Sequence, residues 1–123
     1  MTKRILIVED QEDNRKILRD LLTSAGYEPI EAVTGEEGVT LAETRRPDLV
    51  LMDIMLPGMD GYEITRRLRA DERFRRLPVL ALTAKAMKGD REKCIAAGAS
   101  DYLAKPIDAE RLFSMLRVWL SRD

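Results

Sequence analysis

The sequence predicts an α/β fold in which a doubly wound, five-stranded parallel sheet carries helices on both faces. Three runs of four apolar residues, at 5–8, 49–52 and 79–82, are typical of parallel strands that are buried on both sides. Amphipathic segments separate these runs. A length of 123 residues fits one hydrophobic core, so we assign residues 1–123 to a single domain.

Two weaker strands complete the predicted sheet. Residues 29–33 alternate in polarity and begin with a proline, which suits a strand at the edge of a sheet. Residues 102–104 make a short fifth strand. Strands and helices then alternate along the chain, and right-handed crossovers favour the strand order 2-1-3-4-5, which is the flavodoxin-like order.

The first and last helices are predicted from their apolar stripes. The first covers about residues 14–25 and ends at Gly26, and its stripe consists of Ile17, Leu18, Leu21 and Leu22. The last begins after Asp108 as its N-cap, and its stripe consists of Leu112, Phe113, Leu116, Trp119 and Leu120. Each stripe predicts a helix that packs one side against the sheet.

The middle helices are predicted mainly from their first turns. Thr34 with Glu37, and Asp60 with Glu63, have the spacing of capping boxes and should begin the second and third helices. The fourth helix, near residues 87–97, has no strong apolar stripe and contains a glycine. Because an interior glycine costs about 1 kcal/mol relative to alanine, we expect this helix to be the least stable.

The composition excludes several classes of function. With 21 basic and 22 acidic residues the formal net charge is -1, whereas nucleic-acid-binding domains usually carry a basic excess. The single cysteine, Cys94, cannot form an intramolecular disulfide. It should be a small packed residue of the fourth helix. The early apolar run is too short for a signal peptide or a membrane span. We therefore expect a cytoplasmic protein that binds neither nucleic acid nor membrane.

The sequence contains no histidine, which removes the commonest general base, the commonest zinc ligand and every histidine-activated nucleophile. Any active site must then use carboxylates, lysine and hydroxyl groups. Such side chains occur at the carboxyl ends of the predicted strands, where ligands bind in sheets of this type. They are Glu9 and Asp10 after the first strand, Asp53 after the third, Thr83 after the fourth and Lys105 after the fifth.

Each of these residues alone could be a helix cap or a surface charge. Their common location argues for a site, because three clustered carboxylates repel one another unless a cation is present. Hard oxygen ligands suit Mg²⁺, which often bridges to phosphate. Lys105 could then pair with one phosphoryl oxygen and Thr83 could donate a hydrogen bond to another. Asp53, on the central strand, is the expected nucleophile, since a carboxylate can form an acyl phosphate.

Four blocks of sequence resemble the receiver domains of two-component response regulators. They occur in order at residues 8–10 (VED), 51–61 (LMDIMLPGMDG), 81–84 (ALTA) and 102–106 (YLAKP). The resemblance covers nearly the whole chain, so the receiver domain would span residues 1–123. The segment 84–98 looks most like the receivers of hybrid kinases and of stand-alone phosphorelay regulators.

The resemblance implies that Asp53 accepts a phosphoryl group from a phosphohistidine, carried by a histidine kinase or a histidine phosphotransfer protein. It implies that Mg²⁺ is held by Glu9, Asp10, Asp53 and the backbone carbonyl of Met55. Thr83 and Tyr102 would form a switch pair that changes the affinity for a downstream protein target. The peptide bond between Lys105 and Pro106 would be cis. Such a chain would be a signalling switch and not an enzyme, and at full length it would have no output domain.

Two alternative functions fit the residues less well, and two residue assignments have a simpler alternative. Aspartyl-nucleophile phosphatases resemble one another in a second aspartate two residues after the nucleophile, where this chain has Met55. A flavodoxin-like FMN protein would need a hydroxyl- and glycine-rich loop after the first strand, where residues 9–13 are mostly acidic. Tyr102 could simply be a half-buried strand aromatic. The six arginines between positions 66 and 76 are expected to form a solvated face.

Overall fold

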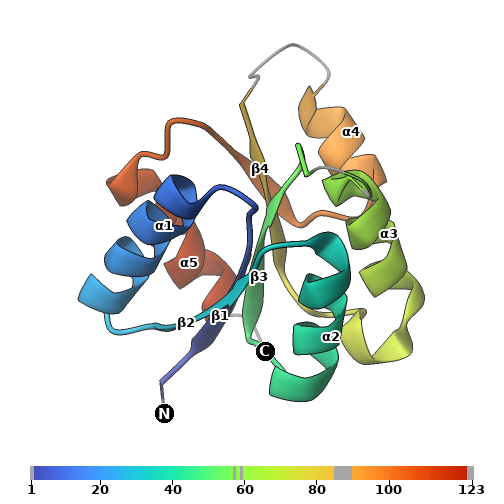
Figure 1. The fold of residues 1–123 in the computed structure, drawn as a ribbon, viewed down its shortest axis with the longest axis horizontal. Helices are drawn as coiled ribbons and strands as arrows, with labels where there is room; N and C mark the ends of the chain where they lie inside the picture. The colour runs from blue at the N-terminus through green and yellow to red at the C-terminus, as the bar shows by residue number, and fades with distance from the viewer. Residues whose placement is uncertain (1, 57, 59, 85–89, 122–123) are drawn as a thin grey trace.

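The computed structural model describes residues 2–56, 58, 60–84 and 90–121. These residues form one sheet of five parallel strands in the order β2-β1-β3-β4-β5 (Figure 1). The strands are β1 (Arg4–Val8), β2 (Glu28–Ala32), β3 (Leu49–Asp53), β4 (Val79–Thr83) and β5 (Asp101–Ala104). The predicted fold class and strand order are therefore confirmed.

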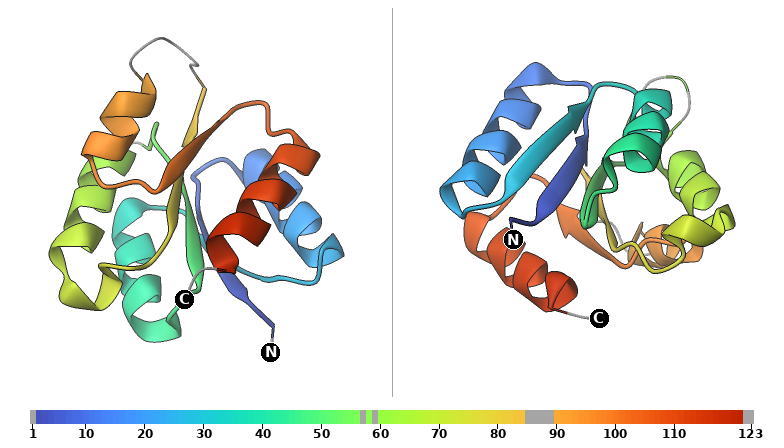
Figure 2. Two further views of the ribbon diagram at one scale, coloured as in Figure 1. Left: turned by 180° about the vertical axis from the view of Figure 1, so that it is seen from behind. Right: turned by 90° about the horizontal axis from the view of Figure 1, so that it is seen from below.

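Helices cover both faces of the sheet, as predicted. α1 and α5 lie on one face, and α2, α3 and α4 lie on the other (Figure 2). The helices are α1 (Glu12–Ser24), α2 (Gly35–Arg45), α3 (Gly61–Ala70), α4 (Asp90–Ala96) and α5 (Ala109–Leu120). A short 3-10 helix, η1 (Glu72–Phe74), follows α3 and has no counterpart in the sequence-based prediction. Among the described residues, no helix combines the length and the apolar character that crossing a bilayer requires.

The core has two layers because alternate residues of a strand point to opposite faces of the sheet. In β1, Ile5 and Ile7 pack with α1 and α5, whereas Leu6 and Val8 pack toward α2 and α3. All four side chains are fully buried. Burial on both faces explains why the three inner strands are continuous apolar runs rather than alternating ones.

The predicted caps begin their helices. The Thr34 hydroxyl accepts a hydrogen bond from the backbone N–H of Glu37 at 3.1 Å. Asp60 accepts one from the N–H of Glu63 at 2.9 Å, and Asp108 accepts bonds from two N–H groups in the first turn of α5. Each cap satisfies a backbone donor that the helix itself leaves unpaired.

The prediction for the first helix is wrong in two details. α1 begins at Glu12, two residues earlier than the apolar stripe indicates. Ile17 is 54% exposed, whereas Leu18 and Leu22 are buried against the sheet. Consecutive helix residues are separated by about 100° around the axis, so a stripe centred on Leu18 and Leu22 turns Ile17 toward solvent.

The strand boundaries differ by one residue from those predicted. β3 and β4 each extend one residue further, so that Asp53 and Thr83 are the last residues of their strands rather than the first residues after them. β2 begins and ends one residue earlier, and Val33 is 43% exposed. The last residue pair between β1 and β2 joins Val8 to Ala32, which explains why β2 ends at Ala32.

The fourth helix is described only from Asp90 onward, and Gly89 lies outside the described residues. Its low stability therefore stays a prediction. Cys94 is fully buried beside the sheet, as expected for a small packed residue. The helix ends near Gly98, whose φ of 109° is one that L side chains rarely adopt.

The arginine-rich segment is only partly a solvated face. Arg69 is partly buried, and its guanidinium donates to the carbonyls of Gly98 and Phe74 at 2.7 Å each. Burial lowers the pKa of Arg69. The expectation is therefore wrong for Arg69, because the end of α3 faces the turn between α4 and β5. The exposed members of the segment are Arg66, Arg67, Arg73, Arg75 and Arg76.

We predict that Gly61→Ala destabilises the protein by about 1–3 kcal/mol, as overpacking of a tight site usually does. A Cβ atom at Gly61 would lie 2.3 Å from the backbone oxygen of Asp53, so main chain would have to move. Urea unfolding measures the loss. Gly38→Ala is the control, because the three atoms nearest to its Cβ all belong to the Val8 side chain, the closest at 2.9 Å, so a side chain rather than main chain has to shift, and alanine favours a helix interior. Equal losses in both variants would contradict the prediction.

Candidate functional site

Three carboxylates meet at the carboxyl ends of β1 and β3. Glu9 is fully buried, Asp53 is 2% exposed and Asp10 is partly exposed. Carboxylate oxygens of the three residues all lie within 4.8 Å of one another. β1 and β3 are hydrogen-bonded neighbours, so the residues that end them are necessarily close. The strand-end pattern in the sequence thus corresponds to an actual cluster.

Lys105 joins this cluster from the end of β5. Its Nζ atom lies 2.8 Å from a Glu9 carboxylate oxygen and 3.3 Å from one of Asp53. Burial acts to lower the pKa of Lys105, but the hydrogen bond to Glu9 and the charges of both carboxylates outweigh it, so that the pKa is raised. The ammonium therefore stays charged and offsets part of the repulsion among the carboxylates. The bond from Lys105 to Pro106 is cis, in agreement with the resemblance.

The two carboxylate oxygens of Asp53 have different neighbours. Oδ1 accepts a hydrogen bond from the backbone N–H of Met55 at 3.0 Å, and Oδ2 faces Lys105. Met55 itself is 63% exposed. Met55, Asp10 and Tyr62 contribute to the lining of an open cleft of about 470 Å³. Solvent can therefore reach the loop that follows Asp53 and the Asp10 side of the cluster.

Thr83 and Tyr102 lie on the same face of the sheet. Ala81 pairs with Tyr102 in the parallel register, and Thr83 pairs with Ala104, and paired side chains point to the same face. Because side chains two residues apart on a strand also share a face, Thr83 and Tyr102 lie on the same side. Thr83 is 5% exposed, at the end of β4. Tyr102 is partly buried and packs with the small cluster that includes Cys94 of α4. The predicted switch residues therefore lie on the side of the sheet that faces α4.

Arg15 is a residue of the site that sequence reasoning misses. Its guanidinium donates to the backbone carbonyls of Glu9 at 2.9 Å and Asp10 at 3.1 Å. It also forms ion pairs with Glu12 and Glu31. Arg15 thus holds the acidic loop in place from the first turns of α1. The only signal in the sequence is a basic residue two positions after the mostly acidic stretch 9–13, which is common on exposed helices.

The chemistry of the donors indicates which metals the cluster could bind. The three acidic residues offer hard oxygen ligands, and no thiolate or imidazole belongs to the cluster as described. Hard oxygen sets of this kind favour Mg²⁺, Ca²⁺ or Mn²⁺ over zinc and copper. The residues present therefore fit a divalent cation of that class.

Comparison with known proteins gives a consistent result. The model of the response regulator receiver domain family matches residues 5–117. The polar-differentiation response regulator DivK of Brucella ovis is 46% identical over 120 residues, which are 98% of each chain. The receiver domain of a sensor histidine kinase from Pseudomonas aeruginosa, solved with a magnesium ion in its active-site cleft, has a TM-score of 0.91 and 43% identity, with 99% of this chain and 100% of that chain covered.

A response regulator from Chloroflexus aurantiacus, described as putative, matches the fold more closely, with a TM-score of 0.95 and 35% identity over 99% of this chain and 100% of that chain. The family match, the high identity over whole chains and the arrangement of the carboxylates and Lys105 agree with one another. The chain belongs to the response regulator receiver domain family and is a signalling switch of two-component systems.

Proposed function

We propose that Asp53 is the phosphoacceptor of a Mg²⁺-dependent switch. The observation that carries this proposal is the contact of the Lys105 ammonium with both Asp53 and Glu9, inside a cluster of three carboxylates. One fixed cation among three anions leaves a net negative site that needs a further cation before a phosphoryl group can approach. The donor is the phosphohistidine of a histidine kinase or of a histidine phosphotransfer protein.

In the transfer step a carboxylate oxygen of Asp53 attacks phosphorus and forms a P–O bond. The P–N bond to the donor imidazole breaks, and the imidazole keeps the electron pair of that bond. Asp53 then carries an acyl phosphate. The Met55 N–H, which donates to Oδ1, fixes the plane of the carboxylate and thereby the direction of attack.

Glu9, Asp10, Asp53 and the backbone carbonyl of Met55 would hold the Mg²⁺ ion. When bound, the ion neutralises the cluster and stabilises negative charge on the transferring group. Arg15 keeps the backbone of Glu9 and Asp10 in place, so that their carboxylates are preorganised before a cation arrives.

Lys105 and Thr83 respond to the new charge on Asp53. The Lys105 ammonium, already in contact with Asp53, moves to a phosphoryl oxygen, and the Thr83 hydroxyl donates to another. Tyr102 follows because it lies on the same face as Thr83 and packs against α4. The consequence is an altered surface around α4 and β5 for a downstream protein target.

The remaining parts of the proposal concern the whole chain. Residues 1–123 act as one receiver domain, whose balanced charge favours protein partners over nucleic acid or membrane. The chain acts as a switch that assists its own phosphorylation and dephosphorylation, and it is not an enzyme that acts on other substrates. It works in the cytoplasm, a reducing compartment that suits a chain with a single cysteine.

The test is direct mapping of the phosphoryl group. Incubation with acetyl phosphate and Mg²⁺ should add one phosphoryl group per chain, visible in the intact mass. Borohydride reduces an acyl phosphate of aspartate to homoserine, so peptide mapping after reduction should find homoserine at position 53. Homoserine at position 10 instead, or phosphate retained on a hydroxyl group, would show that another residue is the acceptor.

Phosphorylation should change amide exchange in α4 and around Tyr102 more than in α3. α3 is anchored by Ile64 and Leu68, which are at most 1% exposed, whereas α4 is seven residues long and buries, over residues 91–96, the side chain of Cys94 alone. Short, weakly anchored elements need the least free energy to shift. Hydrogen exchange with mass spectrometry, with and without acetyl phosphate, measures this over residues 90–97, 101–104 and 61–70. Equal changes in both regions would place the output surface elsewhere.

A further inference from the structure

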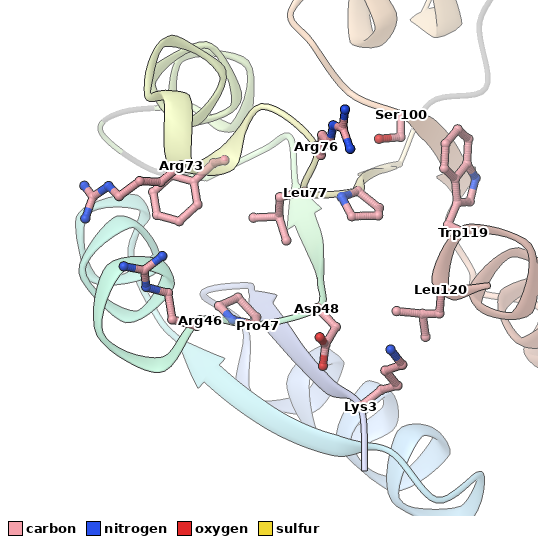
Figure 3. A pocket seen from close by; sticks show the side chains of 12 residues that line it. Lys3, Arg46, Pro47, Asp48, Arg73, Arg76, Leu77, Ser100, Trp119 and Leu120 are labelled. Carbon is pink, nitrogen blue, oxygen red and sulfur yellow. The ribbon is translucent and has the colours of Figure 1, made fainter. Parts of the chain in front are cut away.

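A second cleft, shown in Figure 3, is lined by residues next to the amino ends of the strands. It therefore lies at the opposite end of the sheet from the carboxylate cluster, which follows the carboxyl ends. It has a volume of about 570 Å³ and is open to solvent rather than enclosed. Its walls come from the residues that precede β1, β3, β4 and β5, from η1 and from the last turn of α5. Ligands of sheets like this one normally bind at the carboxyl ends of the strands, so phosphoryl transfer makes no use of this basal cleft.

The basal cleft is positively charged although the chain as a whole is not. One carboxylate lines it, that of Asp48, together with four cationic side chains, those of Lys3, Arg46, Arg73 and Arg76. Asp48 accepts a hydrogen bond from the backbone N–H of Arg4 at 2.8 Å, and Arg73 is paired with Asp71 and Glu43 outside the cleft. Neither Lys3 nor Arg76 forms an ion pair with any carboxylate in the described parts of the chain. The cleft thus carries positive charge that its own residues leave uncompensated.

The basal cleft also has an apolar surface. Leu77 and Pro78 contribute to it from the segment before β4, and Trp119 and Leu120 from α5. Figure 3 shows Arg46 and Arg73 on one side and Trp119 and Leu120 on the other, with Leu77 between them. An apolar centre with a charged rim is the usual composition of a protein interface, and tryptophan and arginine are its commonest energetic hot spots.

We propose that the basal cleft binds an acidic segment of a partner protein. An apolar side chain of that segment would pack on Leu77, Pro78 and Trp119, while its carboxylates would pair with Lys3, Arg46 and Arg76. Charge complementarity favours this occupant, because an uncharged apolar segment would leave the cations without counterions. Since the cleft and Asp53 lie at opposite ends of the sheet, the segment can stay bound while the phosphoryl group is transferred.

Trp119 is the only tryptophan of the chain, so its fluorescence reports binding at the basal cleft directly. The probe is a capped eight-residue peptide with two central leucines and three glutamates on each side. We expect a saturable fluorescence change that weakens with added salt. Replacing the leucines by serine, or the glutamates by glutamine, should weaken the binding, because the first removes the apolar contact and the second removes the charge.

The variant that tests the charges is Lys3→Glu with Arg76→Glu, since both side chains are exposed and their reversal leaves the core intact. We expect the affinity for the probe to fall by about tenfold or more, because like charges then face each other. Arg91→Glu with Arg111→Glu makes the same change in net charge at exposed positions that do not line the cleft. This control should bind within about twofold of the unchanged chain, in keeping with charge that is screened over distance.

Four outcomes would overturn the proposal. The first is no fluorescence change with the glutamate-leucine peptide, and the second is an affinity for that peptide that is equal in the test variant and the control. The third is binding of the glutamine-leucine peptide as tight as that of the glutamate-leucine peptide. The fourth is tighter binding of a single-stranded oligothymidylate than of the glutamate-leucine peptide. The third would indicate a purely apolar groove and the fourth a nucleic-acid site. Unfolding curves establish that each variant is folded. If the double variant is not, the single substitutions Lys3→Gln and Arg76→Gln should each weaken the binding.

Discussion

Asp53→Asn is expected to take up no phosphoryl group from acetyl phosphate, and chelation by EDTA is expected to stop uptake by the unchanged chain. The amide of asparagine keeps the size of the side chain but lacks the anionic oxygen that attacks phosphorus. EDTA acts differently, because the carboxylates then remain uncompensated apart from Lys105 and repel the incoming phosphate. Intact mass spectrometry measures both effects.

Asp20→Asn is the matched control, since it makes the same chemical change on the exposed side of α1, where the carboxylate pairs with Lys16. This variant should take up phosphate as the unchanged chain does. Uptake by Asp53→Asn at the same rate would show that the nucleophile is another residue. Uptake in EDTA would show that the cluster needs no cation for the transfer.

Most of the fold could be predicted because each strand and helix has a local cause. The inner strands are short apolar runs, which are typical of strands buried on both sides, and Thr34, Asp60 and Asp108 mark helix starts by their capping chemistry. Boundaries were harder to predict. Asp53 belongs to β3 because its backbone pairs with β4, and that pairing depends on the register of the whole sheet.

The clustering of the strand-end residues could be predicted from the sequence because parallel strands bring their carboxyl ends to one edge. The contacts within it could not. That Lys105 touches both Asp53 and Glu9 depends on the backbone after β5, and Arg15 acts through backbone carbonyls that have no sequence signature. The exposure of Ile17 and the burial of Arg69 likewise follow from how helices are rotated and placed, which a stripe or a charge cluster does not specify.

Lys105→Ala is expected to stay folded but to lose about 2 kcal/mol of unfolding free energy in the absence of divalent cations. Removing one partner of a fully buried ion pair costs roughly 3–5 kcal/mol, because the remaining charge is left uncompensated. Here Glu9 has no exposed side-chain surface, but the Lys105 side chain is 22% exposed, so solvent moderates the loss. Urea unfolding with EDTA measures the change, and Lys93→Ala, at an exposed position of α4, is the control.

Added Mg²⁺ should restore more stability to Lys105→Ala than it adds to the unchanged chain, because it supplies the missing positive charge to the same carboxylates.

The coupling between phosphate and α4 should nevertheless be lost, since a bound cation does not replace a side chain that moves with the phosphoryl group. Amide exchange over residues 90–97 would then be insensitive to acetyl phosphate even where the intact mass shows phosphorylation. A variant as stable as the unchanged chain in EDTA would show that Glu9 and Asp53 do not depend on Lys105. A variant that unfolds even with Mg²⁺ would make Lys105 a structural residue rather than part of the switch.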